Sequence, residues 1–540
     1  MDTPDLLVTG TIHTLDPVRP RAEALLARGG RIVLLGSAAE CLGAARPGAR
    51  HLDAGGGCVV PGLADAHGHV VLRGLALEQV SLRDAPDEAE CVRRVTERAR
   101  ATPPGTWVRG RGWDQNRWPG QTLPTERALS AATPDHPVLL ERVDGHAAWV
   151  NTRALDLAGI GPNTADPPGG RILRDAQGRP TGTLVDAAQD LVHARIPHPT
   201  GRELERLILT ALGDLVRLGL TAVHDAGCTS SVVRAYARLA AADRLPMRVY
   251  AMIDGNQSAG SLAAELARWS SEPDIGRLEI RAVKLFADGA LGSRGAALLD
   301  GYADDPGNRG LFLLSPKELR ERVSLVARAG FQPAVHAIGD AACREVLRAY
   351  AELARHMDLA RLRPRVEHLQ LVRAEDLALL RESGAVASMQ PVHAIADAPW
   401  VAARVGDGPA LRGAYAWRQV LRTGAPLALG SDFPVESPDP RLGLYAAECR
   451  RPAGATAPWN PEERLSRLEA LLGFTWGAAY AAFAEDRRGV LRERCEADLT
   501  VFADDIFELP AERLPEARVA ATVVGGRVEH EPALPGRAEP

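Results

Sequence analysis

Eight short apolar segments recur along the middle of the 540-residue chain, and stretches with helical periodicity separate most of them. Strands that alternate with helices are typical of parallel sheets, so this pattern predicts an α/β fold. Eight such units predict a (β/α)8 TIM-like barrel. A doubly wound open sheet is the alternative, but no G-x-G-x-x-G motif follows any of the runs. The predicted strands are residues 59–63, 221–225, 247–253, 280–286, 332–336, 365–368, 386–389 and 427–430, with helices expected over 202–218, 316–328, 341–355 and 374–382.

The two ends of the chain differ from this middle region because both carry short β-strand patterns. Residues 5–57 read as short strands separated by turns, and residues 497–530 have the same character. Gly525-Gly526 is a predicted hairpin turn. Because chain termini often lie close together, we expect both ends to form one small discontinuous β-sandwich domain. Its expected bounds are residues 1–58 plus 490–540.

The barrel is then expected over residues 59–489, with an insertion after its first strand at about residues 72–195. This insertion has patterns of its own, which predict a helix over 87–100 and strands over 107–111 and 137–142. Loops at the mouth of a barrel commonly carry binding residues while the scaffold holds the chemistry. We therefore expect the insertion to contribute to substrate specificity.

Ionisable side chains close five of the eight predicted strands, at the end where barrel enzymes place their active sites. The first strand leads through Pro61-Gly62 into His67 and His69, whose spacing lets both rings face one point. We expect the glycine between them to leave room for a metal. The histidines and oxygen donors together suit Zn²⁺ or a similar divalent ion. The other strand-end residues are Lys284, His336, His368 and Asp432.

Each of these residues has a simpler interpretation when it is taken alone. A single histidine after an apolar run is more often a hydrogen-bonded core residue than a ligand. Asp432 before Pro434 fits a helix N-cap. Lys284 in an apolar strand is harder to dismiss, because lysine is almost never fully buried without a partner or a modification. The agreement of five strand ends favours a metal site.

The order of these residues resembles the amidohydrolase superfamily of metal-dependent hydrolases, with His67-Gly68-His69 followed by His336, His368 and Asp432. Five further motifs resemble its YtcJ-like branch, the amidohydrolase family 3 type that includes N-substituted formamide deformylases. The resemblance covers nearly the whole chain, including both β-rich ends. The motifs are Glu141-Arg142-Val143-Asp144-Gly145-His146, Gly182 in Arg179-Pro180-Thr181-Gly182, Lys284-Leu285-Phe286-Ala287-Asp288-Gly289 with Gly292-Ser293-Arg294, Gln390-Pro391-Val392-His393, and Gly430-Ser431-Asp432-Phe433-Pro434-Val435-Glu436.

The resemblance implies that Lys284 is carboxylated to a carbamate, an anionic oxygen ligand that bridges two metals. One metal would be held by His67, His69 and Asp432, and the other would be held by His336 and His368. A hydroxide shared by the two metals would attack the substrate carbonyl. Asp432 would take the proton of this hydroxide and pass it to the leaving group. If Lys284 is unmodified, a mononuclear site or a lysine–substrate contact is the alternative. One or two ions are thus expected, with zinc as the expected metal.

Four residues outside the ligand set are candidates for substrate contacts. Trp113 and His146 lie in glycine-flanked turns of the insertion, and ordinary packing is the alternative for both. Arg294 follows a glycine-rich turn and could clamp a substrate carboxylate or carbonyl. His393 could stabilise an oxyanion as a catalytic group, or it could be a packed loop residue. Four further histidines have no such context and are interpreted as structural: His13, His51, His193 and His198.

Three functions fit these residues. The favoured one is an enzyme that hydrolyses a non-peptide carbon–nitrogen bond in a small amide, formamide or cyclic amide. Hydrolysis of an ester, lactone or phosphoester in the same site is the second, because the metal chemistry is not bond-specific. A non-catalytic metal-binding or small-molecule-binding barrel is the third, and the complete ligand set disfavours it.

Composition narrows the partners and the compartment. The net charge is −5 and no long basic run is present, so nucleic-acid binding is not expected. The N-terminus lacks the pattern of a signal peptide, and no apolar stretch is long enough to span a membrane. Seven cysteines form no CxxC pair, which indicates reduced thiols and a cytoplasmic protein. The oligomeric state stays open, with a homodimer as one option.

Overall fold

The computed structural model describes residues 5–143, 145–270 and 274–532. Two compact units are present, one formed by residues 1–73 and 204–540 and the other by residues 74–203. The first unit contains the barrel and a seven-stranded sheet, and the second is built on a six-stranded sheet. Within the described ranges, none of the helices combines the length and the apolar character that crossing a bilayer requires.

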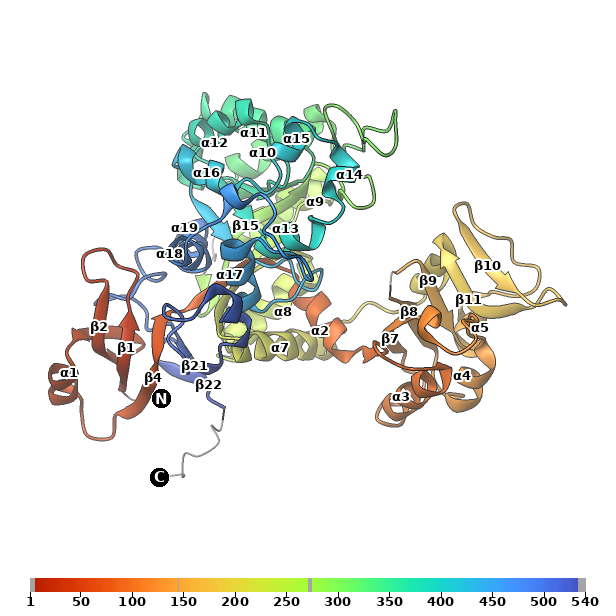
Figure 1. The fold of residues 1–540 in the computed structure, drawn as a ribbon, viewed down its shortest axis with the longest axis horizontal. Helices are drawn as coiled ribbons and strands as arrows, with labels where there is room; N and C mark the ends of the chain where they lie inside the picture. Colours follow the sequence, from red (N-terminus) through yellow and green to blue (C-terminus); the bar gives the residue numbers. More distant parts are fainter. Residues whose placement is uncertain (1–4, 144, 271–273, 533–540) are drawn as a thin grey trace. The chain divides into compact units, whose positions relative to one another are not determined.

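Eight parallel strands form the barrel, which confirms the predicted (β/α)8 architecture (Figure 1). The barrel closes where Gly68 of its first strand forms a parallel bridge with Phe433, in the segment that follows its last strand. There the backbone N–H of Asp432 donates to the carbonyl of His67 at 2.7 Å, and that of His69 donates to Phe433 at 2.8 Å. The strands, in order around the barrel, are β5 (Leu63–Gly68), β12 (Leu220–Cys228), β13 (Arg248–Asp254), β15 (Leu278–Phe286), β16 (Gln332–Ala337), β17 (Arg365–His368), β18 (Val386–Met389) and β19 (Leu427–Leu429).

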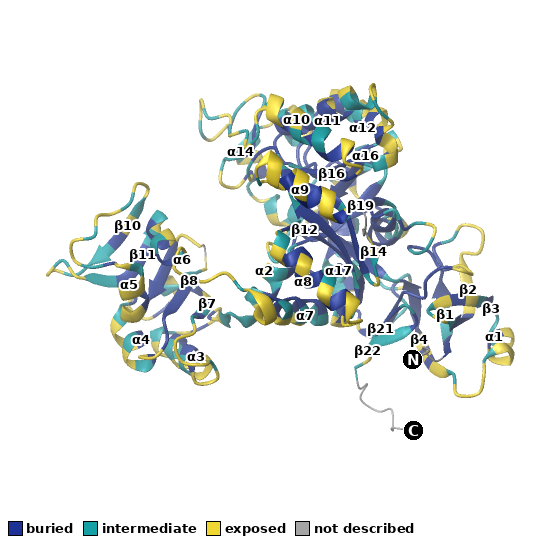
Figure 2. Cartoon of the chain, turned by 180° about the vertical axis from the view of Figure 1, so that it is seen from behind, coloured by how far each residue is buried: buried dark blue, intermediate teal, exposed yellow. Residues whose placement is uncertain are grey.

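Amphipathic helices surround these strands. Helix α7 (Gly201–Arg217) illustrates the pattern, because its buried residues recur every three or four positions. Figure 2 shows barrel strands such as β12, β16 and β19 as buried, while the helices carry exposed residues on their outer sides. The other main helices between strands are α8 (Ser230–Ala241), α9 (Ala259–Trp269), α10 (Pro316–Arg328), α11 (Asp340–Ala354), α12 (Leu377–Ser383) and α16 (Trp417–Thr423).

The prediction for the first barrel strand was wrong in its bounds. Val59 and Val60 belong to β4 (Arg50–Pro61), a strand of the seven-stranded sheet, and the barrel strand β5 begins only at Leu63. The side chain of Val59 packs in the core of the sheet, and that of Val60 packs in the core of the barrel. A strand between two apolar cores is apolar on both faces, which is why this run looks like a barrel strand.

The seven-stranded sheet joins the two ends of the chain, as predicted. Strand β4 pairs in parallel with β1 (Leu6–His13) and antiparallel with β20 (Leu499–Phe502). Both ends thus contribute to one sheet, and one of its faces packs against the barrel. The remaining strands are β2 (Arg21–Arg28), β3 (Arg31–Gly36), β21 (Val519–Val524) and β22 (Arg527–His530), with the short helix α1 (Ala38–Ala44) beside them.

The second unit contains the insertion. The predicted helix and strands are observed as α3 (Glu88–Arg100), β7 (Val108–Trp113) and β8 (Val138–Arg142). Trp113, Trp118 and Trp149 form the aromatic part of its core. The other elements are α4 (Glu126–Ala132), α5 (Thr152–Ala158), β6 (Val80–Ser81), β9 (Ala147–Val150), β10 (Gly170–Arg174) and β11 (Pro180–Asp186). This unit therefore has a hydrophobic core of its own.

Candidate metal centre

Six ionisable side chains gather at the carboxyl ends of the barrel strands. The imidazole rings of three histidines lie close together. The ring centroid of His368 is 4.8 Å from that of His67 and 4.6 Å from that of His336. The side chain of Lys284, from β15, lies beside these rings, with its Nζ 3.0 Å from Nε2 of His67. Asp432, three residues beyond the end of β19, approaches from the other side of the barrel seam.

Hydrogen bonds fix the orientation of three of the imidazoles. Nδ1 of His67 donates to Glu367 Oε2 at 2.5 Å, and Nδ1 of His69 donates to the carbonyl of Ala226 at 2.9 Å. Nδ1 of His368 donates to Gln390 Oε1 at 2.8 Å. Because each Nδ1 carries the proton, each Nε2 is left as a lone-pair donor toward the centre of the barrel, as in metal-ligating histidines.

Three nitrogen and oxygen atoms in this cluster, each able to bind a metal, have no hydrogen-bond partner within the described part of the chain. They are Nε2 of His336, Nε2 of His393 and Oδ1 of Asp432, all shielded from solvent. An unsatisfied buried polar atom costs about 1–3 kcal/mol, so three such atoms would be unfavourable unless a ligand satisfies them. Donor atoms of His67, His69 and Asp432 lie within 4.8 Å of one another. The residues present therefore fit a bound divalent cation.

The protonation states favour the same interpretation. Burial lowers the pKa of His67 to about 4 and that of His336 to about 3, so both rings are neutral, which is the form that binds metals. Burial raises the pKa of Asp432, but the neighbouring imidazoles, with Nε2 of His69 3.0 Å from Oδ1, outweigh burial and keep the carboxyl ionised. Burial also lowers the pKa of Lys284 to about 8. A larger share of this amine than of an ordinary lysine is therefore uncharged near neutrality.

A buried polar network behind His67 was not predicted from the sequence. Glu367 accepts the Nδ1 proton of His67 and is itself bound by Arg365, whose Nε donates to Glu367 Oε1 at 2.6 Å. Arg365 also contacts His224, with 2.9 Å between Nη1 and Nδ1. All these side chains are buried. The sequence does contain a signal of this network. Arg365 and Glu367 are oppositely charged and two positions apart in an apolar strand, so they share one face of it.

A second carboxylate holds the barrel seam next to the ligands. Oδ1 of Asp65 accepts the backbone N–H groups of His67 and Ser431, and Oδ2 accepts the hydroxyl of Ser431. Gly68 lies between the two histidines, where a glycine was expected to leave room for a metal. The structure gives another reason for a residue without a side chain. A Cβ atom at Gly68 would lie 2.1 Å from the ring of Phe433, so the residue is small because the ring packs against its backbone.

The structure places two of the four substrate-contact candidates in the barrel unit. His393, in α13 (Pro391–Asp397), lies with Nε2 3.7 Å from Asp432 Oδ2, and its ring stacks near His368 with centroids 6.1 Å apart. Arg294 lies in the loop after β15, where its guanidinium is paired with Asp304 at 3.0 Å. A substrate clamp by Arg294 stays a prediction, and its carboxylate partner in this structure is Asp304.

The other two candidates lie in the second unit. Trp113 is completely buried there, and its Nε1 donates to the carbonyl of Leu140 at 2.8 Å, so the ring serves as a core residue of that unit. His146 is largely exposed, and its Nδ1 lies 2.8 Å from Asp186 Oδ1. Asp144 of the same motif lies outside the described residues.

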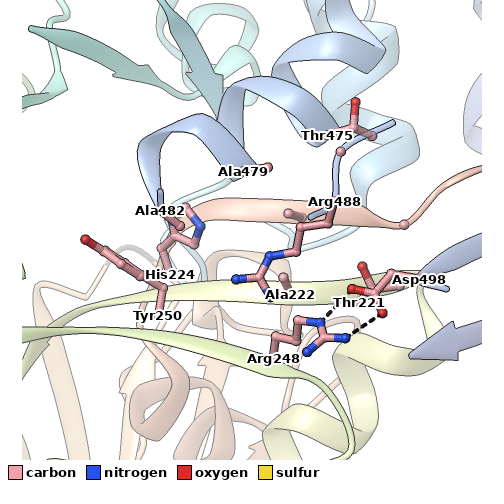
Figure 3. A pocket seen from close by; sticks show the side chains of 13 residues that line it. Thr221, Ala222, His224, Arg248, Tyr250, Thr475, Ala479, Ala482, Arg488 and Asp498 are labelled. Carbon is pink, nitrogen blue, oxygen red and sulfur yellow. Dashed lines mark hydrogen bonds and ion pairs between the residues drawn. The ribbon is translucent and has the colours of Figure 1, made fainter. Parts of the chain in front are cut away.

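An enclosed cavity of about 20 Å³ lies at the opposite end of the barrel, where strands β5, β12 and β13 begin. Figure 3 shows the pair formed by Arg248 and Asp498 beside Arg488, with His224 farther along the lining. A cavity of this volume holds about one water molecule. It therefore has room for a buried water and no room for an organic substrate.

A (β/α)8 barrel whose strand ends carry four histidines, a lysine and an aspartate has the architecture of a metal-dependent hydrolase. The profile of the amidohydrolase family matches residues 50–530, and the chain belongs to this family. A structure titled as an uncharacterized metal-dependent hydrolase from Pyrococcus furiosus superposes with a TM-score of 0.76 at 29% identity. That likeness covers 91% of this chain and 97% of the archaeal one.

Similar sequences support the same family and its YtcJ-like branch. The putative amidohydrolase YtcJ of Bacillus subtilis is 32% identical over 97% of this chain and 98% of its own length. The N-substituted formamide deformylase of Arthrobacter pascens is 29% identical over the same shares of the two chains. Protein LONG AFTER FAR-RED 3 of Arabidopsis thaliana is 34% identical over 97% of this chain and 91% of that protein.

Proposed function

We propose that the protein hydrolyses a carbon–nitrogen bond in a small amide, formamide or cyclic amide, with one or two Zn²⁺ ions held at the strand ends. The observation that carries the proposal is the set of buried, unpartnered donor atoms that converge beside Asp432. The likeness to a relative named as an N-substituted formamide deformylase supports the choice of bond. Imidazole and carboxylate donors in this number suit zinc.

His67, His69 and Asp432 would hold one ion, and His336 and His368 would hold the other. When bound, such ions lower the pKa of water toward neutrality and polarise a carbonyl group. Glu367, Ala226 and Gln390 keep the imidazoles oriented, so the ligands need little reorganisation on binding.

Asp432 is the proposed proton carrier. Its Oδ1 has no hydrogen-bond partner in the described chain, and its pKa is held below the ordinary range, so it is an ionised acceptor in the resting site. It would take a proton from the attacking water and return it to the leaving nitrogen. His393, whose Nε2 faces Asp432 at 3.7 Å, would donate a hydrogen bond to the oxygen on which negative charge develops.

Lys284 is proposed to be carboxylated. Its amine would attack carbon dioxide, form a new N–C bond and release a proton, which gives an anionic carbamate oxygen pair. Its lowered pKa supplies the uncharged amine that this reaction needs. The carbamate would replace a buried cation by a metal ligand, which offsets the cost of burying a lysine among apolar side chains.

The experiment is a metal analysis joined to a substrate panel. Purified protein should contain one or two zinc equivalents per chain and hydrolyse formamides, amides or cyclic amides. A chelator should abolish the hydrolysis, and zinc should restore it. The double variant His67→Ala/His69→Ala should lose the metal of the barrel centre and the activity while keeping the circular dichroism of the wild type. Metal content unchanged in that variant would refute the site.

The substrate panel also decides which type of bond the protein hydrolyses. It should include esters, lactones and phosphoesters of matched size, because the same site chemistry could serve them. Faster hydrolysis of an ester series than of the matched amides would replace the proposed activity and leave the metal site in place.

We further propose a cytoplasmic location, since all seven cysteines are buried and unpaired.

A further inference from the structure

A second group of metal-binding side chains lies in the seven-stranded sheet and shares no residue with the barrel centre. His13 is the last residue of β1, Cys58 belongs to β4, and Asp505 follows β20. One donor atom from each lies within 4.8 Å of the other two. Three segments that are far apart in the sequence therefore bring a nitrogen, a sulfur and an oxygen donor to one point.

Neighbouring contacts hold this cluster in place. Nε2 of His13 lies 3.0 and 3.2 Å from the two carboxylate oxygens of Asp505. Oδ1 of Asp505 accepts the backbone N–H of Phe507, whose ring stacks on His13 with centroids 4.1 Å apart. The thiol of Cys58 donates to the carbonyl of Asp504 at 3.6 Å. The donor atoms are thus positioned by the strands and by the turn after β20.

The charges of the cluster match a divalent cation. His13 and Cys58 are buried, while the Asp505 side chain keeps 16% of its surface exposed, which gives the site contact with solvent. Burial lowers the pKa of His13, so its ring is available as a neutral donor. Burial raises the pKa of the Cys58 thiol to about 12. A thiolate here needs a cation beside it, and one thiolate with one carboxylate balances two positive charges.

We propose that His13, Cys58 and Asp505 form a second metal site for Zn²⁺ or another thiolate-binding divalent cation. Three protein ligands leave a fourth position for water or for the carbonyl of Asp504. Binding would release the thiol proton to solvent and would join the end of β1, strand β4 and the turn after β20. The site would stabilise the sheet and would take no part in hydrolysis.

Without a cation, the same residues would form only a hydrogen bond between His13 and Asp505 beside an inert thiol. Cobalt separates these two cases, because a thiolate bound to Co²⁺ gives an intense charge-transfer band in the near ultraviolet. The barrel centre has only nitrogen and oxygen donors, so it contributes no such band. Metal-free protein titrated with Co²⁺ should therefore develop the band if Cys58 is a ligand.

Three variants test the assignment. Cys58→Ser should lose the charge-transfer band and one zinc equivalent per chain, and its hydrolytic activity should stay close to that of the wild type. Cys495→Ser is the matched control, since Cys495 is also a buried free cysteine near the same sheet. This control and the His67→Ala/His69→Ala variant should both keep the band. No band in the wild type, or a band that persists in Cys58→Ser, would overturn the proposal.

A further variant covers the case in which Cys58→Ser does not fold. Asp505→Asn keeps an oxygen that can accept the N–H of Phe507 but removes the negative charge. It should bind Co²⁺ at least ten times more weakly than the wild type, read from the same band during titration. An affinity equal to that of the wild type would remove Asp505 from the site and contradict the proposed ligand set.

Discussion

Replacement of Glu367 by glutamine tests whether the network behind His67 tunes the metal centre. The glutamate receives the Nδ1 proton of His67 at 2.5 Å and lies against the Arg365 guanidinium at 2.6 Å, and all three side chains are inaccessible to solvent. Glu367→Gln keeps the shape and an oxygen acceptor but removes the negative charge. His67 then becomes a weaker electron donor, and Arg365 loses its only carboxylate partner among the described residues.

Two magnitudes follow from these contacts. Loss of a carboxylate that orients a metal-binding histidine typically lowers metal affinity roughly 10- to 100-fold, or about 1.4–2.7 kcal/mol. Removal of one partner of a buried ion pair costs about 3–5 kcal/mol of unfolding free energy. Because glutamine retains one hydrogen bond to His67 or Arg365, we expect about 3 kcal/mol in the metal-free protein.

Competition with a fluorescent zinc chelator measures the affinity, and urea unfolding of the metal-free protein measures the stability. Glu463→Gln is the matched control, because Glu463 is also buried and accepts the backbone N–H of Arg418, which is not a proposed ligand. It should lose stability without loss of zinc affinity. If Glu367→Gln binds zinc as tightly as the wild type, the network has only a packing role and the reasoning is wrong.

Three further predictions concern the proposed catalytic carboxylate, the barrel seam and the seven-stranded sheet. Asp432→Asn should lower kcat by about 10²- to 10⁴-fold at saturating zinc while much of the metal is retained, and a rate restored by added metal would make the residue a ligand only. Gly68→Ala should cost about 1–3 kcal/mol in urea unfolding, since the new methyl group would displace the Phe433 ring, and unchanged stability would contradict this. Burial raises the pKa of Asp498, but its pair with Arg248 outweighs burial and lowers it below its ordinary value of 3.8. The resulting stability is present above pH 3.8 and is lost as the pH falls below it, so Asp498→Asn should flatten the acid limb of a stability–pH curve, and an unchanged limb would count against the pair.

The barrel could be predicted from the sequence because its signal is local. Short apolar runs and helical periodicity mark each βα unit without knowledge of any partner strand. Strand β4 was misassigned for the opposite reason. Its apolar run reflects a position between the sheet core and the barrel core, and that position depends on β20 near the other end of the chain.

The same distinction holds at the metal centre. His67, His336, His368 and Asp432 could be found because each follows or ends a predicted strand. The contact between Glu367 and His67 could not be found, because it joins two strands that are not neighbours in the barrel and depends on the depth to which each side chain reaches. Charged side chains inside an apolar strand are the residues to inspect in such cases.

The continuity of β4 and β5 has a consequence for the synthesis of the protein on the ribosome. Residues 50–68 pass from the sheet into the barrel, so β5, which carries His67 and leads to His69, directly follows a strand that has β20 as its neighbour. Strand β20 leaves the ribosome only when nearly the whole chain has been made. The first two proposed ligands are therefore translated early, while the sheet that leads into their strand is completed late. A nascent chain that stalls before residue 499 would expose the unpaired edge of β4 to aggregation or to chaperones.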